Sequence, residues 1–216
     1  MAKKLNPVVG FYDPMNLADA DFWGMGNEAT IGFLRHAEIK HGRIAMFAFV
    51  GYIVHANGIK FPWAMQMDGT PFPSETNPPA LWDAIPDTAK WQIFTVIAFL
   101  EFWSELSTPE HKHYMAGGKP GDFPDFTTGP DGIPHPVPFN LYDPFKLSKN
   151  MSEETKERRL LAEINNGRAA MLGIFGFLSA QCAEGSVPAL AGVVQPYSGE
   201  PMAPFVTNYL GQPWGL

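Results

Sequence analysis

Ala37-Glu38-Ile39-Lys40-His41-Gly42-Arg43-Ile44-Ala45-Met46 is the stretch on which the fold depends, because it occurs twice. At an offset of 125 residues the chain reads Ala162-Glu163-Ile164-Asn165-Asn166-Gly167-Arg168-Ala169-Ala170-Met171. Eight of fifteen positions are identical between residues 37–51 and 162–176, which indicates an internal repeat. Tyr12-Asp13-Pro14 likewise returns as Tyr142-Asp143-Pro144. Each half therefore leads from a Tyr-Asp-Pro turn to a segment with the pattern Glu-x-x-(His or Asn)-Gly-Arg.

Both copies of this pattern lie in segments that are predicted to be helices. These segments contain no proline and are rich in Ala, Leu, Met and Glu, which favours helix. Gly42 and Gly167 have no side chain, so another backbone or a flat ligand can approach them closely. With a third proline-free segment, the predicted helices are residues 31–56, 87–107 and 152–184, and the predicted loops are residues 57–86 and 108–150. At 216 residues, the whole chain (1–216) is predicted to be a single domain.

Glu38 and His41 are three residues apart, so on a helix they lie about 60° apart and roughly 4.5 Å apart along the axis. Glu163 and Asn166 repeat this placement. The simplest interpretation is a helix start with solvated charges, and a second is a carboxylate-bridged di-metal helical bundle enzyme, whose helices carry Glu-x-x-His. A third is a set of axial ligands to the magnesium of a tetrapyrrole. Carboxylate, imidazole and amide groups all offer a lone pair to a hard ion that is already largely coordinated.

The two arginines of the repeat suggest how such carboxylates are neutralised. If the first and last helices cross as a pseudo-symmetric pair, Glu38 meets Arg168 and Glu163 meets Arg43. The apolar part of the first helix, 44–54, is only eleven residues long, whereas a membrane span needs about 20. Hydropathy alone therefore favours a soluble core helix. An unpaired charge at the bilayer centre costs about 2.5–3.5 kcal/mol or more, so a span here requires the charges to be paired.

At this point the chain resembles a known family. Glu-x-x-His-Gly-Arg in a first helix and Glu-x-x-Asn-Gly-Arg in a last helix are similar to the light-harvesting chlorophyll-binding antenna family of chloroplasts, and the resemblance covers most of the chain. Within that family, residues 135–144 and the segment Gly185-Ser-Val-Pro-Ala-Leu resemble the chlorophyll a/c membrane antennae of red-lineage plastids. These are the peridinin-type antennae of dinoflagellates, to which the likeness is greatest, and the fucoxanthin-type antennae.

The resemblance implies an all-α membrane protein with three transmembrane helices. The first and third would cross as a pseudo-twofold pair, and the second would stand beside them. It also implies that magnesium is present only as the central ion of chlorophyll, and that Arg43 and Arg168 neutralise the ligating glutamates. The implied magnesium ligands are Glu38, His41, Glu101, Glu163 and Asn166.

Three of the candidate ligands lie outside the repeated motif. Glu101 is a carboxylate in an apolar stripe of the predicted middle helix, where an unpaired Glu is expensive to bury, and the resemblance matches it to a chlorophyll ligand. His55 lies fourteen residues after His41, within about 40° of the same face and roughly 21 Å further along the axis. It is predicted to hold an extra pigment, although an interfacial histidine at a helix end is the alternative. Gln181 is the corresponding candidate in the last helix, about 60° from the direction of Asn166.

The distribution of positive charge predicts a sidedness. The net charge of −7 argues against a nucleic-acid partner, since no basic patch offsets it. Residues 1–43 and 103–168 hold thirteen of the fifteen Lys and Arg residues, and only Lys60 and Lys90 lie elsewhere. With three spans these two segments share one side of the membrane, which fits the positive-inside pattern. For a chloroplast antenna, this predicts that the N-terminus is stromal.

No separate site is predicted in the rest of the chain. The loop histidines His111, His113 and His135 lack the regular spacing of four zinc ligands, so they are expected to be solvated. Residues 1–10 lack the apolar core of a signal peptide, and any transit sequence is expected to lie outside this chain.

The implied function is to absorb light and to transfer excitation energy to a photosystem, with photosystem I favoured, and not to act as an enzyme. The implied cofactors are chlorophyll a, chlorophyll c, a carotenoid (peridinin, diadinoxanthin or fucoxanthin) and lipid. The implied partners are a photosystem core, neighbouring antenna subunits and the chloroplast thylakoid membrane. The alternative is a photoprotective, energy-dissipating member of the same superfamily, and the di-metal enzyme is a distant alternative.

Overall fold

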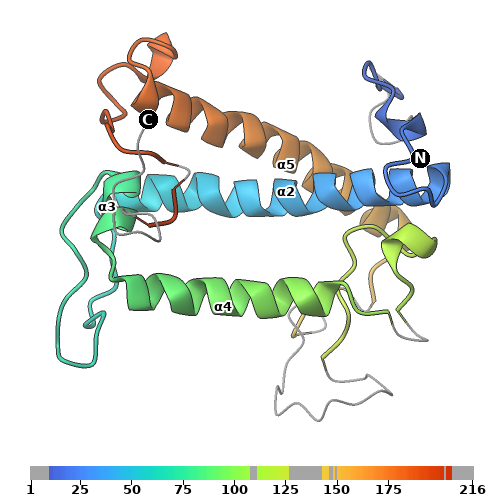
Figure 1. Cartoon of the computed structure of the whole chain (residues 1–216), viewed down its shortest axis with the longest axis horizontal. Coiled ribbons are helices and arrows are strands. Elements are labelled where there is room, and N and C mark those ends of the chain that lie inside the picture. The colour runs from blue at the N-terminus through green and yellow to red at the C-terminus, as the bar shows by residue number, and fades with distance from the viewer. Residues whose placement is uncertain are drawn as a thin grey trace. The chain divides into compact units, whose positions relative to one another are not determined.

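The structure is a computed structural model that describes residues 10–107, 111–126, 143–145, 148, 150–201 and 203–205. The regular structure of these residues is entirely helical (Figure 1), which confirms the all-α prediction for this part of the chain. The α-helices are α2 (Asn27–Ala56), α3 (Pro78–Ala84), α4 (Asp87–Ser104) and α5 (Glu153–Cys182). Three short 3-10 helices are η1 (Leu17–Asp19), η2 (Tyr114–Ala116) and η3 (Pro188–Leu190).

The helix α3 corrects one expectation. Residues 57–86 are predicted above to be a loop, and this prediction is wrong for Pro78–Ala84. Pro78 and Pro79 occupy the first helical positions, where the missing backbone N–H groups have no helical partner in any case. Asn77 is extended before them, and its carbonyl accepts from the Leu81 N–H at 2.8 Å. The prolines therefore start a helix here.

The chain divides into two compact units. Unit 1 comprises residues 1–44 and 99–168, and unit 2 comprises residues 45–98 and 169–216. The long helices α2, α4 and α5 each contribute one segment to unit 1 and one to unit 2. The repeated Glu-x-x-(His or Asn)-Gly-Arg motifs both lie in unit 1.

Unit 1 is built around equivalent residues of the two repeats. Ile39 of α2 and Ile164 of α5 are buried at its centre, with Leu160 and Leu161 packed against them. The two motif glycines face each other across the same contact. A Cβ atom on Gly42 would lie 3.0 Å from Cα of Gly167, and a Cβ atom on Gly167 would lie 2.8 Å from Cα of Gly42. The glycines thus let the two backbones approach to a distance that no side chain would allow.

The aspartates of the Tyr-Asp-Pro turns in unit 1 accept hydrogen bonds from backbone N–H groups four to five residues later. Asp13 accepts from the N–H groups of Leu17 and Ala18, each at 2.9 Å. Asp143 accepts from the N–H of Ser148 at 2.7 Å, the same spacing of five residues as from Asp13 to Ala18. Aspartate side chains commonly hold turns in this way. Of the second turn the structure describes residues 143–145, and Tyr142 lies outside the described residues.

Unit 2 joins α2 and α5 through aromatic packing. Phe177 stacks on Phe49 and Tyr52, with ring centroids 5.1 and 4.5 Å apart. Gly173 makes room for this cluster, since a Cβ atom there would lie 2.6 Å from the ring of Phe49. Further along, the Tyr197 hydroxyl donates to Asp83 of α3 at 2.5 Å.

Many large apolar side chains of the three long helices are exposed in the described part of the chain. On α2 these include Ile44, Phe47, Val50 and Ile53, on α4 Trp91, Val96, Ile97 and Phe102, and on α5 Leu172 and Phe175. None of the helices among the described residues is both long enough and apolar enough to qualify by hydropathy as a membrane span.

Candidate functional site

The candidate site begins with Glu38, whose carboxylate is held between two guanidinium groups. Its Oε1 accepts from Nε and Nη2 of Arg168, at 2.7 and 2.6 Å. Its Oε2 accepts from Nη1 of Arg35, three residues earlier on α2, at 2.5 Å. Arg168 comes from α5, so the repeat brings these two motif residues together as the sequence predicts.

The reciprocal pair has one cation fewer. Oε1 of Glu163 accepts from Nε of Arg43 at 2.6 Å, while Nη1 of Arg43 donates to the carbonyl of Gly121 at 2.6 Å. Within the described residues Oε2 of Glu163 has no partner. The repeat position equivalent to Arg35 is Leu160, which explains the difference. The two glutamates are therefore related by sequence symmetry but differ in local charge.

One ring nitrogen of His41 is engaged by the helix backbone. Its Nδ1 lies 2.8 Å from the carbonyl oxygen of Ala37. A carbonyl can only accept, so Nδ1 carries the hydrogen and Nε2 of the neutral ring keeps its lone pair. His41 is exposed, and so is Asn166 at the equivalent position of α5. Both residues offer a neutral donor at the surface of unit 1, which fits an axial ligand to a magnesium ion that enters with its own ring.

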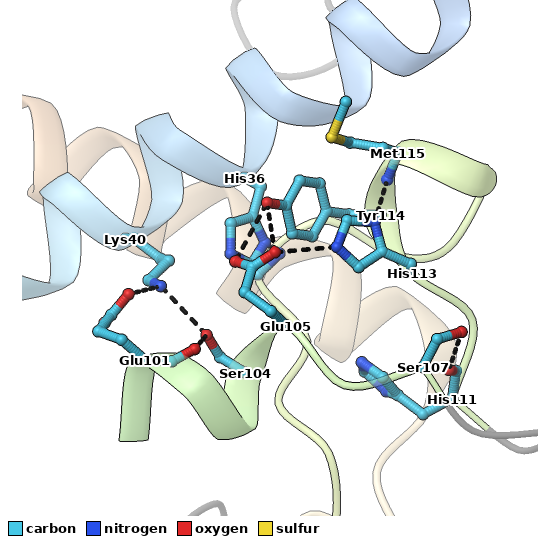
Figure 2. A network of polar contacts seen from close by, with 11 residues as sticks. His36, Lys40, Glu101, Ser104, Glu105, Ser107, His111, His113, Tyr114 and Met115 are labelled. Atoms are coloured by element: carbon cyan, nitrogen blue, oxygen red, sulfur yellow. Dashed lines mark hydrogen bonds and ion pairs between the residues drawn. The ribbon is translucent and has the colours of Figure 1, made fainter. Parts of the chain in front are cut away.

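Glu101 of α4 is paired with a residue that the repeat did not indicate. Its Oε2 accepts from Nζ of Lys40 on α2, and the same ammonium lies 3.3 Å from Oγ of Ser104 (Figure 2). Thus each of the three candidate carboxylates, Glu38, Glu101 and Glu163, is neutralised by a cation from another helix. A neutralised carboxylate can ligate a metal without leaving a net charge in an apolar setting.

The sequence of the chain also matches known proteins. The sequence profile of the family described as Chlorophyll A-B binding protein matches residues 1–182. The chain belongs to this family. It is 35% identical over 172 residues to Fucoxanthin-chlorophyll a-c binding protein F, chloroplastic, of Phaeodactylum tricornutum, covering 80% of this chain and 74% of that protein. It is 36% identical over 187 residues to Fucoxanthin-chlorophyll a-c binding protein, chloroplastic, of Trieres chinensis, covering 84% and 78%. The resemblance to the fucoxanthin-type antennae is thereby confirmed.

The remaining candidate ligands of this light-harvesting antenna protein are His55 and Gln181. His55 is exposed in the last turn of α2, and its carbonyl accepts from the N–H of Gly58 at 2.9 Å, so it lies where the helix is capped. Gln181 is buried, and its amide nitrogen donates to Oδ1 of Asn77 at 2.6 Å. Its Oε1 is buried without a partner among the described residues.

Within unit 1, the loop residues 111–126 pack against His36 of α2 and Glu105, just after α4, through a network that the sequence did not predict. His36 stacks on Tyr114 with ring centroids 3.8 Å apart, and its Nδ1 accepts from the N–H of Gly121 at 3.1 Å. The Tyr114 hydroxyl donates to Glu105, which also lies 2.9 Å from Nε2 of His113 (Figure 2). Burial and the Glu105 carboxylate raise the pKa of Tyr114 to about 12, so the phenol stays protonated and keeps donating.

This network shows that the expectation of solvated loop histidines is wrong for two of them. The side chain of His113 is 22% exposed and bound to Glu105, and that of His111 is 16% exposed and 3.5 Å from Asp122. His113 is held by Glu105 next to the end of α4, and His111 lies against Asp122 of the same loop. His135 lies outside the described residues. No group of three or more His, Cys, Asp or Glu residues in the described part of the chain is arranged to hold a metal ion.

Two cations that pair with carboxylates of the site, Arg35 and Lys40, were not predicted from the sequence. Arg35 could have been found, because it lies three residues before Glu38 and such pairs face each other on a helix. Lys40 carried no comparable signal, since its partner Glu101 is 61 residues away and outside the repeat.

Proposed function

We propose that this chain is a thylakoid membrane antenna that binds chlorophyll a, chlorophyll c and a carotenoid and delivers excitation energy to a photosystem. The observation that supports this most strongly is the cross-helix neutralisation of Glu38, Glu101 and Glu163, together with the exposed imidazole of His41, whose Nδ1 is engaged by the Ala37 carbonyl. Bound chlorophylls would supply the absorption and the energy transfer. The residues of the chain provide axial ligands, fix the spacing of the pigments and exclude water; no bond chemistry is assigned to them.

The ligands proposed for chlorophyll magnesium are those whose donor atoms fit. Glu38, Glu101 and Glu163 supply charge-compensated oxygens, and His41 and Asn166 supply neutral donors. His55 and Gln181 are proposed as further ligands, His55 from its exposed position and Gln181 through its unpartnered Oε1.

We also propose that α2, α4 and α5 span the membrane, with α2 and α5 as the crossed pair. Their hydropathy is too low to indicate this, but much of the charge that lowers it is internally paired. A helix of 30 residues such as α2 is about 45 Å long, and the hydrocarbon core of a bilayer is about 30 Å thick. Lipid and carotenoid would cover the exposed apolar side chains. Gly51 and Gly176 leave room for a carotenoid, because a Cβ atom at either would have no neighbour within 4 Å among the described residues beyond the backbone of its own helix.

The relatives named above carry fucoxanthin in their names, which supports fucoxanthin as the carotenoid over peridinin or diadinoxanthin. A photosystem core, with photosystem I favoured, and neighbouring antenna subunits are the proposed partners in the chloroplast. The second candidate function, dissipation of energy within the same superfamily, uses the same ligands and differs in the fate of the excitation.

Refolding the protein with chlorophyll a, chlorophyll c and fucoxanthin tests the function. We expect a coloured complex in which light absorbed by chlorophyll c or the carotenoid excites chlorophyll a fluorescence with a nanosecond-scale lifetime, about as long as that of chlorophyll a in detergent. A complex with a strongly shortened lifetime would favour dissipation. Failure to retain pigment after purification, while a fucoxanthin-chlorophyll relative refolded in parallel retains it, would contradict both functions. Co-purification with photosystem I or photosystem II from thylakoids identifies the partner.

The proposed topology predicts a protease pattern. Trypsin added to intact thylakoids is expected to cut after Lys112, which is exposed in the loop on the proposed stromal side; Lys119 precedes Pro120, which blocks trypsin. Lys60, on the proposed opposite side, serves as the internal control and should be cut only after the membrane is ruptured. Mass spectrometry of the fragments reads out both sites, and the reverse pattern would invert the topology.

A further inference from the structure

The pair formed by Lys40 and Glu101 is a charged contact between two helices that the internal repeat does not explain. Lys40 lies three residues before Arg43 on α2, so the two side chains leave the helix about 60° apart. Arg43 reaches Glu163 on α5 and Lys40 reaches Glu101 on α4. The first motif helix therefore supplies one cation to each of the other two long helices within unit 1.

The position of the Lys40 ammonium is fixed from two sides. Besides Glu101, it contacts Oγ of Ser104, which is buried and itself donates to the backbone carbonyl of Glu101 at 2.7 Å. Ser104 thus ties the ammonium to the last turn of α4, one helical turn after the carboxylate (Figure 2). A mobile surface lysine would have no such second contact.

The carboxylate keeps one oxygen available. Lys40 engages Oε2 of Glu101, and within the described residues Oε1 has no partner. The side chain of Glu101 is 55% exposed, whereas that of Lys40 is 27% exposed. Apolar surface borders the pair, because Phe102 is 70% exposed on α4 and Ile44 is 67% exposed one turn after Lys40. A free oxygen beside open apolar surface is the setting that a flat ring with a central metal ion requires.

We propose that Lys40 is the counter-charge that allows Glu101 to ligate a chlorophyll on α4, so that pigment binding at α4 depends on a residue of α2. This inference rests on the proposed antenna function. A lone carboxylate under an apolar macrocycle would be a desolvated, unpaired charge, which is strongly unfavourable. Lys40 removes that penalty, and it acts on the pigment only through Glu101.

The test compares refolded complexes by their chlorophyll-to-protein ratio. Lys40→Met, which keeps most of the side-chain stem and removes the charge, is expected to lose one chlorophyll per monomer. Lys40→Arg should keep it, because the guanidinium preserves the charge. Glu101→Leu should also lose one chlorophyll, and the double variant Lys40→Met with Glu101→Leu should lose one and not two. Lys156→Met is the matched control, since its partner Glu153 is 85% exposed and is no ligand; it should lose none.

A second comparison uses only charge-balanced variants and holds even if Lys40→Met does not assemble. An amide oxygen is a neutral donor that needs no counter-charge. Lys40→Met with Glu101→Gln should therefore bind one chlorophyll more than Lys40→Met with Glu101→Leu. Equal ratios in these two variants, or an unchanged ratio in an assembled Lys40→Met, would overturn the proposal. A wild-type protein that binds no chlorophyll would instead refute the antenna function, so the two failures are distinguishable.

Discussion

Replacing Gly167 with alanine is expected to destabilise the contact between α2 and α5 by about 1–3 kcal/mol, the usual range for overpacking a tight interior. The added Cβ atom would lie 2.8 Å from Cα of Gly42, and a backbone atom cannot turn aside as a side chain can. The two helices must separate, which would also strain the ion pairs on either side of the contact. Thermal unfolding of the refolded complex, followed by circular dichroism, measures the loss.

Gly176→Ala is the matched control in the same helix. A Cβ atom at Gly176 meets no protein atom within 4 Å, and alanine is a better helix former than glycine by roughly 1 kcal/mol. We therefore expect no loss of protein stability from this change. Equal destabilisation by both substitutions would show that the close approach of Gly42 and Gly167 is not what limits the packing.

Arg43→Leu is expected to lower the stability of the complex by about 1.5–3 kcal/mol, a typical value for hydrogen bonds that involve a charged group. It removes the cation of Glu163 and the donor to the Gly121 carbonyl. Adding Glu163→Gln should recover part of the loss, because the neutral amide of glutamine needs no counter-charge. The part due to Gly121 should remain. A double-mutant cycle on unfolding free energy isolates the coupling, which is expected between 0.5 and about 3 kcal/mol.

The equivalent cycle on the other pair gives a sharper comparison. Arg168→Leu leaves Glu38 with Arg35 as a remaining cation, so its coupling to Glu38→Gln should be smaller than that of Arg43 to Glu163. Lys156→Leu, which breaks an exposed pair with Glu153, should change stability by less than about 1 kcal/mol. Strict additivity in the Arg43 and Glu163 cycle would mean that the cross-helix pair contributes no coupling.

Much of the candidate site could be predicted because its motif occurs twice in the sequence. The two Glu-x-x-(His or Asn)-Gly-Arg segments share a spacing, and two such helices related by a pseudo-twofold axis must place each glutamate near the arginine of the other. The glycine of each motif then lies at the crossing. These features need only the helical period within each motif and the recurrence of the motif at an offset of 125 residues, and both can be read from the sequence.

The contacts outside the repeat could not be predicted in this way. Pairing Lys40 with Glu101 joins residues 61 positions apart, and docking the loop through Gly121 on His36 joins residues 85 positions apart. No periodicity connects such residues. The partial burial of His111 and His113 was missed for the same reason, since loop composition does not indicate the surface on which a loop packs.

The sequence by itself determined the helical class, the family, the equivalence of the two motifs and the residue types that can ligate magnesium. Only the tertiary structure decided that Lys40 faces Glu101 of α4 and that the loop containing Gly121 docks on His36. The physical reason is that ligand type and helical spacing are local properties of the chain. The charge around each ligand depends on which helix surfaces meet, and that is settled by the packing of the whole unit.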